Sequence, residues 1–494
     1  MTRPGLRWVP HAVLLAGMAL RVGLAVVMPA DYAYDDHLAP ILKIAHEGRL
    51  PRAEECWECY QPPAYYLVSA GVFRATEGAM LAAGASADVA GWRGHKAIQF
   101  VSVVAGCTTL LVCRAVLRRV YQLTPVAEGL ALAIPALLPQ HIYMSAMVTN
   151  DALTYCVASL AIWATLRAHA GDWSTRWCVA AGALAGATVL CKAYGLVTVA
   201  VVAALAVVMG MARVLRMAQT ARGTRGRGAA PSAWAALRPA VLVPAFALTV
   251  CVWPSVRNQA LYQRLHVDNF QFFRTGMHSQ PPGTTAGVSF TSLRFLRLLE
   301  FPWIHVAHLD SFWTEMYARF WFDYEWMTLT LRSDRAWMER RARIQQQHGG
   351  WSLATWKAIL NWVPDDVPTD FARVARIAYV GGLPLTLLVL AGVALALRRF
   401  LGNFALALLL LHLAGCLCVP LFQVLRLPYF AAMKAAFALS GLSSVPVLAA
   451  GAHAALRGRW QTAATLVAWL AVAAVALANV GYIAAFKAHL APAG

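Results

Sequence analysis

Long runs of apolar residues recur along the whole chain and are separated by short polar stretches. An α-helix needs about 18 or more apolar residues to cross a bilayer, and about eleven runs approach or exceed this length. The pattern therefore predicts an all-α polytopic membrane protein with about eleven transmembrane helices. The runs lie near 8–29, 97–118, 126–148, 151–169, 175–191, 194–212, 239–257, 373–397, 403–421, 432–453 and 462–485.

A further apolar run, residues 61–80, begins with Gln-Pro-Pro-Ala-Tyr-Tyr. If it crossed the membrane, every later loop would change sides, and the Arg pairs at 118–119 and 398–399 would face outward. Cytoplasmic loops normally carry the excess of Lys and Arg. We therefore predict that 61–80 forms an interfacial helix within the first outer loop, and that the N-terminus is cytoplasmic.

Charge divides the chain into three parts under this topology. Of the 23 acidic residues, seven fall in 31–60 and eleven in 258–372, whereas Arg dominates the loops on the other side. We predict a transmembrane module in 1–257 with its outer loop at 30–96, a mostly helical outer domain in 258–372, and a C-terminal transmembrane module in 373–494.

Composition agrees with a membrane protein. The chain is 60% hydrophobic and 13% charged, whereas soluble domains carry about 25% charged residues. The net charge of +19 comes mostly from predicted cytoplasmic loops, so it reflects topology and attraction to anionic lipid rather than nucleic-acid binding. Arg21 and Glu128 lie within apolar spans, and the sequence gives no reason for them.

The outer segment 258–372 is rich in Trp, which disordered segments are not, so we expect it to be folded. Two uses of these rings stay open: a belt at the membrane interface, or a surface that stacks on a sugar or anchors a partner. The eight residues are Trp303, Trp313, Trp321, Trp326, Trp337, Trp351, Trp356 and Trp362.

Two of the ten cysteines stand apart from the rest. Eight fall inside apolar runs, where a thiol usually serves packing. Cys56 and Cys59 instead form Cys-Trp-Glu-Cys in the predicted outer loop. A zinc site would need two more ligands, and none is suitably spaced nearby, so we predict a short disulfide in an oxidising compartment.

Paired carboxylates follow the first predicted span. Asp35 and Asp36 lie just beyond its outer end, where the span would hold them in place. One of them could accept a proton from an attacking hydroxyl, or both, together with a phosphate and Asp151, could bind a divalent cation. The alternative is a solvated acidic turn.

Three further polar sites fall on the same predicted side. Asp151 stands at a tight junction between spans, either as a helix cap or as part of a site. Lys192 lies in another tight turn and could reach headgroups or a bound phosphate. Arg426 and Lys434 flank a Pro-Tyr turn at Tyr429, and two cations suit a phosphate. Carboxylates and cations thus converge on one membrane face.

In these residues the sequence resembles the GT-C superfamily of membrane glycosyltransferases, particularly protein O-mannosyltransferases and lipid A aminoarabinose transferases. The resemblance covers about the first 260 residues, in an order that few unrelated proteins would share. An acidic pair (Asp35-Asp36) is followed by a Pro-Pro-x-Tyr-Tyr helix start (62–66), an Asn-Asp corner (150–151) and a Lys-x-x-Gly turn (192–195).

The resemblance implies roles for these residues. Asp35 would be the catalytic base, Asp36 its acidic neighbour, Asp151 a second acidic group in the cavity, and Lys192 a contact to the donor phosphate. Aminoarabinose transferases have a Lys before the interfacial proline, where this chain has Gln61. Gln61 and the adjacent Tyr60, with Tyr429, are predicted substrate contacts. His305 and His308, in the outer segment, are candidates for acceptor contact only.

The sequence thus predicts an inverting transferase of the cell envelope. It would move a monosaccharide from a polyprenyl-phosphate donor to an acceptor hydroxyl at the outer face of a bacterial inner membrane. No cofactor is implied beyond a divalent cation. Two other functions stay open: a transporter, although no internal repeat or interrupted central helix is apparent, and a catalytically silent membrane scaffold.

Overall fold

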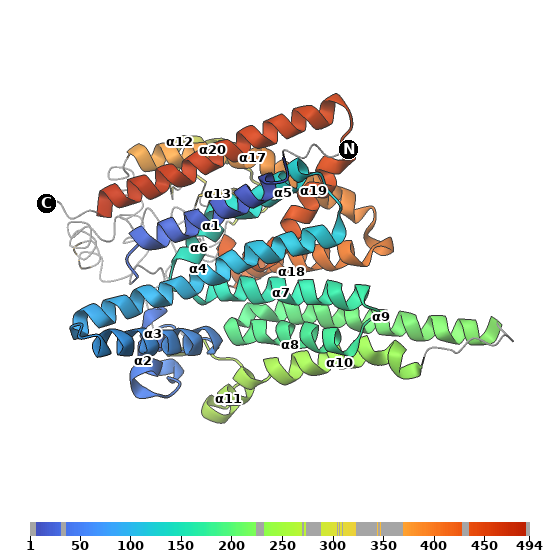
Figure 1. Ribbon diagram of the computed structural model, residues 1–494, viewed down its shortest axis with the longest axis horizontal. Helices are drawn as coiled ribbons and strands as arrows, with labels where there is room; N and C mark the ends of the chain where they lie inside the picture. The colour runs from blue at the N-terminus through green and yellow to red at the C-terminus, as the bar shows by residue number, and fades with distance from the viewer. Residues whose placement is uncertain are drawn as a thin grey trace.

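The computed structural model describes residues 6–30, 36–223, 232–268, 271–272, 288–303, 305, 307–308, 310–322, 343, 346, 369–426 and 434–490. Within these residues every regular element is a helix, and a single isolated bridge joins Ser289 to Ser311. The prediction of an all-α fold is therefore confirmed. Long helices run side by side across the molecule in Figure 1.

Eight helical segments of the described residues are long and apolar enough to cross a membrane, which confirms an integral multi-pass membrane protein. The predicted total of about eleven is not confirmed, because α5 (Pro125–Leu137) and α8 (Thr175–Cys191) are shorter and α7 (Asn150–Ala170) falls outside this set. The eight are built from α1 (Val9–Val27), α4 (Ala87–Val120), α9 (Leu196–Gly223), α10 (Ala233–Cys251), α17 (Thr369–Leu397), α18 (Phe404–Arg426), the 3-10 helix η8 (Ala435–Ser444) with α19 (Val445–Ala455), and α20 (Arg459–Leu490).

Small residues bring α8 close to α10. A Cβ added to Gly182 would lie 2.4 Å from the carbonyl oxygen of Val243, and one added to Gly186 would lie 2.5 Å from that of Ala247. Small residues four positions apart let two helix backbones approach in this way. The position of α8, which ends just before Lys192, is therefore fixed by contact with main chain.

Residues 36–86, part of the predicted first outer loop, form short helices at one end of the bundle. They lie at the end opposite the N-terminus, together with α11 (Figure 1). Their bounds are α2 (Leu38–Glu47), η2 (Ala53–Glu55) and α3 (Ala64–Ala82), with α11 at Trp253–Tyr262. α3 is not one of the eight long apolar segments, and its interfacial position stays a prediction.

Hydrogen bonds join α11 to this loop. Arg257 donates to the carbonyl of Pro51 at 2.6 Å, and the Tyr262 hydroxyl accepts from the backbone N–H of Ala53 at 2.8 Å. The same hydroxyl donates to the carboxylate of Glu54 at 3.1 Å. The first outer loop is thus held by the segment that follows α10.

The predicted span at 126–148 is not one continuous helix. α5 ends at Leu137, and α6 (Pro139–Ala146) begins two residues later. Because Pro139 has no N–H, it cannot donate to the carbonyl of Pro135, and the helix is interrupted here. The prediction of an unbroken span is wrong at this point, and so is the prediction that no central helix is interrupted.

Arg21 satisfies the carbonyls that this break exposes. Its guanidinium donates to the carbonyls of Pro135 at 3.2 Å and Ala136 at 2.9 Å, while the Asn479 amide donates to that of Leu137 at 2.9 Å. Arg21 is fully buried. Unpaired carbonyls at a helix end inside a membrane protein are costly, so Arg21 has a structural reason that the sequence did not reveal.

Glu128 is explained by ion pairing at the other end of α5. It lies in the first turn of that helix, where a negative charge is favourable. Its carboxylate accepts from Arg114 at 2.7 Å and from Arg118 at 2.8 Å. Glu128 therefore joins α4 to α5.

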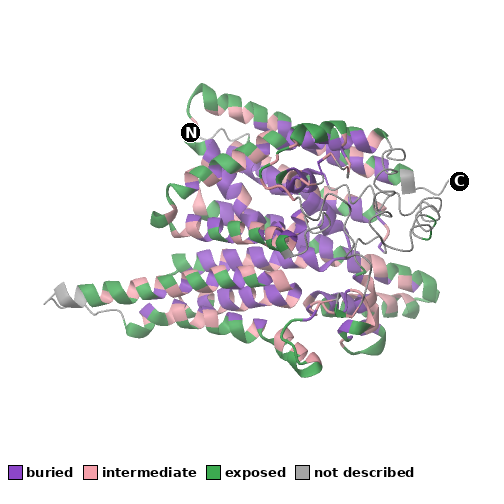
Figure 2. Cartoon of the chain, turned by 180° about the vertical axis from the view of Figure 1, so that it is seen from behind, coloured by how far each residue is buried: buried purple, intermediate pink, exposed green. Residues whose placement is uncertain are grey.

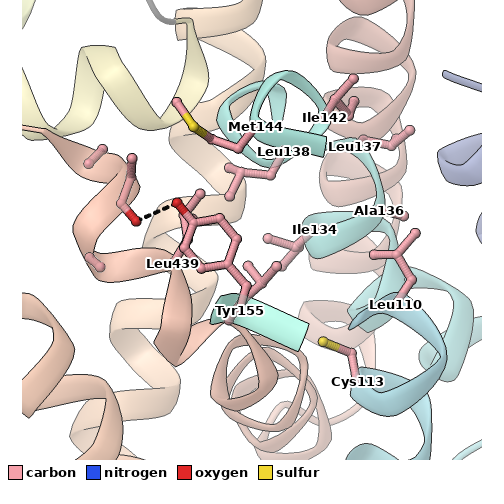
Figure 3. Close-up of a cluster of buried hydrophobic side chains, with 14 of the residues drawn as sticks. Leu110, Cys113, Ile134, Ala136, Leu137, Leu138, Ile142, Met144, Tyr155 and Leu439 are labelled. Atoms are coloured by element: carbon pink, nitrogen blue, oxygen red, sulfur yellow. Dashed lines mark hydrogen bonds between the residues drawn. The ribbon is translucent and has the colours of Figure 1, made fainter. Parts of the chain in front are cut away.

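Buried residues gather in the middle of the bundle, and exposed ones line the outward faces of the peripheral helices (Figure 2). Figure 3 shows part of this core, in which Leu110, Ile134, Tyr155 and Leu439 come from four elements. The Tyr155 hydroxyl of α7 donates to the carbonyl of Ala436 in η8 at 2.8 Å. This bond fixes the start of η8 against α7.

The described part of the outer segment includes α12 (Phe295–Glu300) and α13 (Phe312–Trp321). Trp321 is buried, and its indole N–H donates to Thr386 in α17 at 2.8 Å, so this ring serves packing. Trp313 is exposed and donates to the carbonyl of Phe290 at 2.9 Å. Five of the eight tryptophans lie outside the described residues, namely Trp326, Trp337, Trp351, Trp356 and Trp362.

Candidate functional site

Asp151 stands in the first turn of α7, and its carboxylate accepts three hydrogen bonds. The Lys192 ammonium donates to Oδ2 at 2.7 Å, the Tyr194 hydroxyl to Oδ1 at 2.5 Å, and the Thr149 hydroxyl to Oδ2 at 3.0 Å. Thr149 also accepts from the backbone N–H of Asp151 and is therefore the residue that caps α7. The carboxylate of Asp151 is used instead to hold Lys192.

Lys192 faces the protein and not the lipid headgroups. Its side chain is 9% exposed and that of Asp151 is 8% exposed, so the ion pair is buried. The ammonium also lies 5.6 Å from the ring centre of Tyr194 and 5.8 Å from that of Phe437, within the range of cation–π attraction. These contacts orient the charge at a defined point beside the end of α8.

The Lys-x-x-Gly sequence has a steric reason. Residues 193–195 form a 3-10 turn that folds back on α8, and a Cβ on Gly195 would lie 2.4 Å from the carbonyl carbon of Thr188. The Thr188 hydroxyl donates to the carbonyl of Gly195 at 2.9 Å. Glycine at this position lets the turn close tightly enough to bring Tyr194 to Asp151.

The C-terminal module reaches the same place through η8. Phe437, which contacts Lys192, donates its backbone N–H to the carbonyl of Lys434 at 3.2 Å. Lys434 therefore begins a helix that starts beside Lys192. Arg426 ends α18, but its side chain lies outside the described residues, as does all of Tyr429. Their predicted phosphate and substrate contacts stay predictions.

The first outer loop meets this corner through His37. The His37 ring lies 2.8 Å, through Nδ1, from the Tyr66 hydroxyl, and both side chains are buried. His37 and Tyr66 both lie close enough to Asp151 to interact electrostatically with its carboxylate. The residue that follows the acidic pair is therefore a neighbour of the Asp151–Lys192 pair.

The tyrosines of the Pro-Pro-x-Tyr-Tyr sequence connect α3 to this corner. The Tyr65 hydroxyl shares a hydrogen bond with Ser102 of α4 at 3.1 Å, and Ser102 donates to the carbonyl of Thr149 at 3.4 Å. Tyr65 is fully buried. The sequence pointed to this motif only by resemblance, and the structure shows that Tyr65 links α3 through Ser102 of α4 to Thr149 at the start of α7.

Gln61 and Tyr60 belong to a polar cluster that the sequence indicated only in part. The Gln61 amide donates to the Glu58 carboxylate at 3.0 Å and to the Tyr60 hydroxyl at 2.8 Å. Glu58 is only 3% exposed. A buried carboxylate in this loop is a functional candidate. Its position between Cys56 and Cys59 is the sequence feature that could have drawn attention to it.

The acidic pair is only half described. Asp36 is exposed, and its carboxylate accepts from the backbone N–H of Ala39 at 3.1 Å at the start of α2. Asp35 lies outside the described residues. No group of three metal-binding side chains occurs in the described part of the chain. A divalent cation on Asp35, Asp36 and Asp151 therefore stays a prediction.

Cys56 and Cys59 form a disulfide in the structure. It closes the turn next to η2, where Arg49 pairs with Glu55 at 2.7 Å. Hydrogen bonds from Arg49 lower the pKa of Glu55 to about 2, against the smaller opposing effect of burial. The loop between α2 and α3 is thus held by a covalent link and an ion pair.

His308 is not available for the predicted acceptor contact. It is fully buried, its Nδ1–H donates to Glu315 at 2.7 Å and its Nε2–H donates to the carbonyl of Phe301 at 3.1 Å. Burial is the largest single effect and would lower the pKa of His308. The hydrogen bond and charge of Glu315, together with backbone hydrogen bonds to Phe301 and Trp303, outweigh it and raise the pKa above the ordinary value. The prediction is wrong for His308. His305 stacks on Phe301, and its role stays a prediction.

Comparison with known proteins gives a family match that includes the Asp151–Lys192 pair. Residues 79–221 match the family of dolichyl-phosphate-mannose-protein mannosyltransferases. The matched stretch contains both Asp151 and Lys192, and it confirms the resemblance to GT-C glycosyltransferases that the motifs indicated. It covers less than a third of the chain. No curated protein matches the sequence.

Two solved structures resemble the chain in fold. An oligosaccharyltransferase from Archaeoglobus fulgidus, solved with Zn and sulfate, aligns with a TM-score of 0.48 at 15% identity, covering 96% of this chain and 53% of its own. ArnT from Cupriavidus metallidurans bound to undecaprenyl phosphate aligns with a TM-score of 0.35 at 16% identity, covering 90% and 77%. The chain therefore spans about half the length of the archaeal enzyme.

Proposed function

We propose that the protein is an inverting glycosyltransferase that moves a monosaccharide from a polyprenyl-phosphate donor to an acceptor hydroxyl at the outer membrane face. One observation carries the proposal. The buried Lys192–Asp151 pair lies where the first outer loop meets the ends of α7 and α8, beside His37. A cation held at the end of a membrane bundle suits the phosphate of a lipid-linked donor, and the match to the mannosyltransferase family supports the same chemistry.

Lys192 would stabilise the leaving phosphate. An ammonium has three N–H donors, and one is used by Asp151 in the described structure. The others can bond phosphate oxygens as negative charge develops on them, and a charge fixed in advance in an apolar site is effective at this. Asp151 and Tyr194 would act as positioning residues, because they fix Lys192 without needing to touch the donor.

Asp35 would be the base. The chain is fixed on both sides of it, since Lys96 and Gln99 donate to the carbonyl of Met28 and His37 contacts Tyr66. Two residues of chain span at most about 7 Å, so the backbone of Asp35 cannot lie far from that of His37. We propose that its carboxylate takes the proton of an acceptor bound beside Asp151.

The reaction would be a single displacement. The acceptor oxygen forms a bond to the anomeric carbon while the bond from that carbon to the phosphate oxygen breaks and leaves its electron pair on the phosphate. The hydroxyl proton passes to Asp35. Attack from the opposite face inverts the anomeric configuration. Arg426, Lys434 and Tyr429 would add contacts to the donor, and Gln61 and Tyr60 contacts to sugar or acceptor.

The outer side of a bacterial inner membrane is the proposed location, with the N-terminus in the cytoplasm. The disulfide of Cys56 and Cys59 supports an oxidising compartment for the loop that carries Asp35. Any requirement for a divalent cation would be tested by adding a chelator to the transfer assay.

The test uses the full-length protein in proteoliposomes with radiolabelled polyprenyl-phosphate sugars. Asp35→Asn should abolish transfer, while Asp172→Asn, which changes an exposed carboxylate at the other end of the molecule, should leave it intact. Retained stability and correct insertion of Asp35→Asn show that the loss is chemical. Transfer at the wild-type rate by Asp35→Asn would reject the proposed base.

A transporter is the second candidate, because interrupted helices often line transport sites. The break at Pro139 is such an interruption. However, its freed carbonyls are bonded to Arg21 and Asn479, and the hollow beside Pro139 and Asn479 measures about 20 Å³, room for roughly one water. A break with satisfied carbonyls beside so small a hollow favours a structural role. Solute counterflow in the same proteoliposomes would instead support transport.

A further inference from the structure

Three arginines surround a hollow at the end of the bundle that lies opposite the candidate site. The hollow measures about 410 Å³ and is lined by Arg119 of α4, Arg167 of α7 and Arg176 of α8, together with Ser174 and Trp177. Arg167 and Asp151 belong to the same helix. At about 1.5 Å per residue they lie roughly 24 Å apart along its axis, so this hollow is separate from the Asp151–Lys192 corner.

Trp177 brings two of these charges together. The guanidinium of Arg167 lies 5.1 Å from the centre of the Trp177 ring, and that of Arg176 lies 5.7 Å from it. Trp163 packs edge-on against Trp177 and also contacts Arg167 at 5.8 Å. Two guanidinium groups held against one ring repel each other unless an anion lies between them.

No acidic residue is available here to serve as that anion. In the sequence, Glu128 and Asp172 are the only acidic residues on the arginine-rich side. Glu128 is bonded to Arg114 and Arg118, and Asp172 is bonded to Arg213. In the part of the chain that the structure describes, the three arginines of the hollow therefore have no acidic partner.

The N-terminus of α8 adds donors to the hollow. Ser174 precedes this helix, and its hydroxyl makes no capping hydrogen bond. The first backbone N–H groups of a helix favour an anion. Two tryptophans at this level are typical of the membrane interface, where the polar headgroups of the bilayer lie. The occupant that fits the charge, the donors and the depth is therefore a phosphate carried by a lipid.

We propose that this hollow binds the phosphodiester headgroup of an anionic phospholipid from the adjacent leaflet, through Arg119, Arg167 and Arg176. The guanidinium groups supply paired N–H donors that match phosphate oxygens, and the acyl chains lie along the apolar faces of the neighbouring helices. The proposal does not depend on the transferase reaction. It gives a specific binding role to three arginines whose presence the usual excess of Arg in cytoplasmic loops would otherwise explain.

The experiment counts lipids on the full-length protein by native mass spectrometry after release from nanodiscs that contain phosphatidylglycerol and phosphatidylcholine. The pocket variant is Arg119→Gln, Arg167→Gln, Arg176→Gln. The matched control is Arg398→Gln, Arg457→Gln, Arg459→Gln, which removes the same charge from exposed residues at the same end. We expect the affinity for one phosphatidylglycerol to fall roughly tenfold more in the pocket variant than in the control.

Three outcomes would overturn the proposal. Equal retention by the pocket variant and the wild type would show that the hollow holds no lipid. Equal losses in pocket and control variants would show general attraction to the charged surface. Release of phosphatidylglycerol by millimolar inorganic phosphate would show a site for a soluble anion. Circular dichroism and insertion equal to wild type confirm that the pocket variant is folded, and phosphatidylcholine retention provides the internal reference.

Discussion

Asp151→Asn tests the buried pair on which the candidate site depends. The substitution keeps the shape of the side chain, but one of the two acceptor oxygens becomes an NH2 group that only donates. It therefore removes acceptor positions used by Tyr194, Thr149 and Lys192, and it leaves the Lys192 ammonium buried without a counter-charge. Both side chains of the pair are less than a tenth exposed. Removing one partner of such a pair typically costs about 3–5 kcal/mol of stability. We therefore expect the free energy of unfolding to fall by about that amount.

The double variant Asp151→Asn, Lys192→Met separates stability from function. Removing both charges of a buried pair is often nearly neutral, so most of the lost stability should return. Transfer should not return, because the proposed phosphate contact is gone. Unfolding would be followed in mixed micelles by rising dodecyl sulfate, and transfer in proteoliposomes. The matched control is Asp172→Asn, whose carboxylate is 78% exposed and should contribute no more than about 1 kcal/mol.

Two results would refute this reasoning. A loss below about 1 kcal/mol for Asp151→Asn would mean that the pair is not buried as described. A stable double variant with wild-type transfer would mean that Lys192 only balances Asp151 and does not bind the donor. The second result would leave the fold unchanged but remove the observation that carries the proposed function.

Other contacts give further expectations. Arg21→Met should destabilise the protein by about 2–4 kcal/mol in the same unfolding assay, because it leaves two carbonyls of α5 unpaired. The raised pKa of His308 contributes stability below its unfolded pKa of about 6.5, and this is lost as pH rises through the folded pKa. Hydrogen exchange in α13, corrected for intrinsic rates, should increase over that rise, and His308→Gln should show no such change. Tyr66→Phe, which loses the contact to His37, should lower transfer more than stability.

It could be predicted from sequence that Asp151 and Lys192 lie at the same end of the bundle. Apolar runs and arginine placement put Asp151 and Lys192 at the same end, and α7 and α8 form the hairpin that this requires. The direction of the Lys192 side chain could not be predicted. It depends on the tight turn at Gly195 and on Asp151, which is 41 residues away in the chain. The hydropathy pattern predicts neither the tight turn at Gly195 nor the contact between Lys192 and Asp151.

Arg21, which the sequence left unexplained, has partners far along the chain. Arg21 bonds the carbonyl of Pro135, 114 residues away, and Asn479 bonds that of Leu137, 342 residues away. No local pattern can reveal such a contact. Pro139 was a usable signal for the broken helix, but hydropathy counted it within an otherwise continuous apolar run.

The candidate site combines helices from the N-terminal half of the chain with η8 from the C-terminal part. Tyr155 of α7 bonds η8, and Phe437 of η8 packs on the Lys192 ammonium. The stretch that matches the mannosyltransferase family ends at residue 221, so it includes the ion pair but not the helix that covers it. Lys434 directly precedes η8, and its contact with the donor stays a prediction. Without η8 in place, Lys192 would lack the apolar ring of Phe437, which excludes water and strengthens its attraction to Asp151.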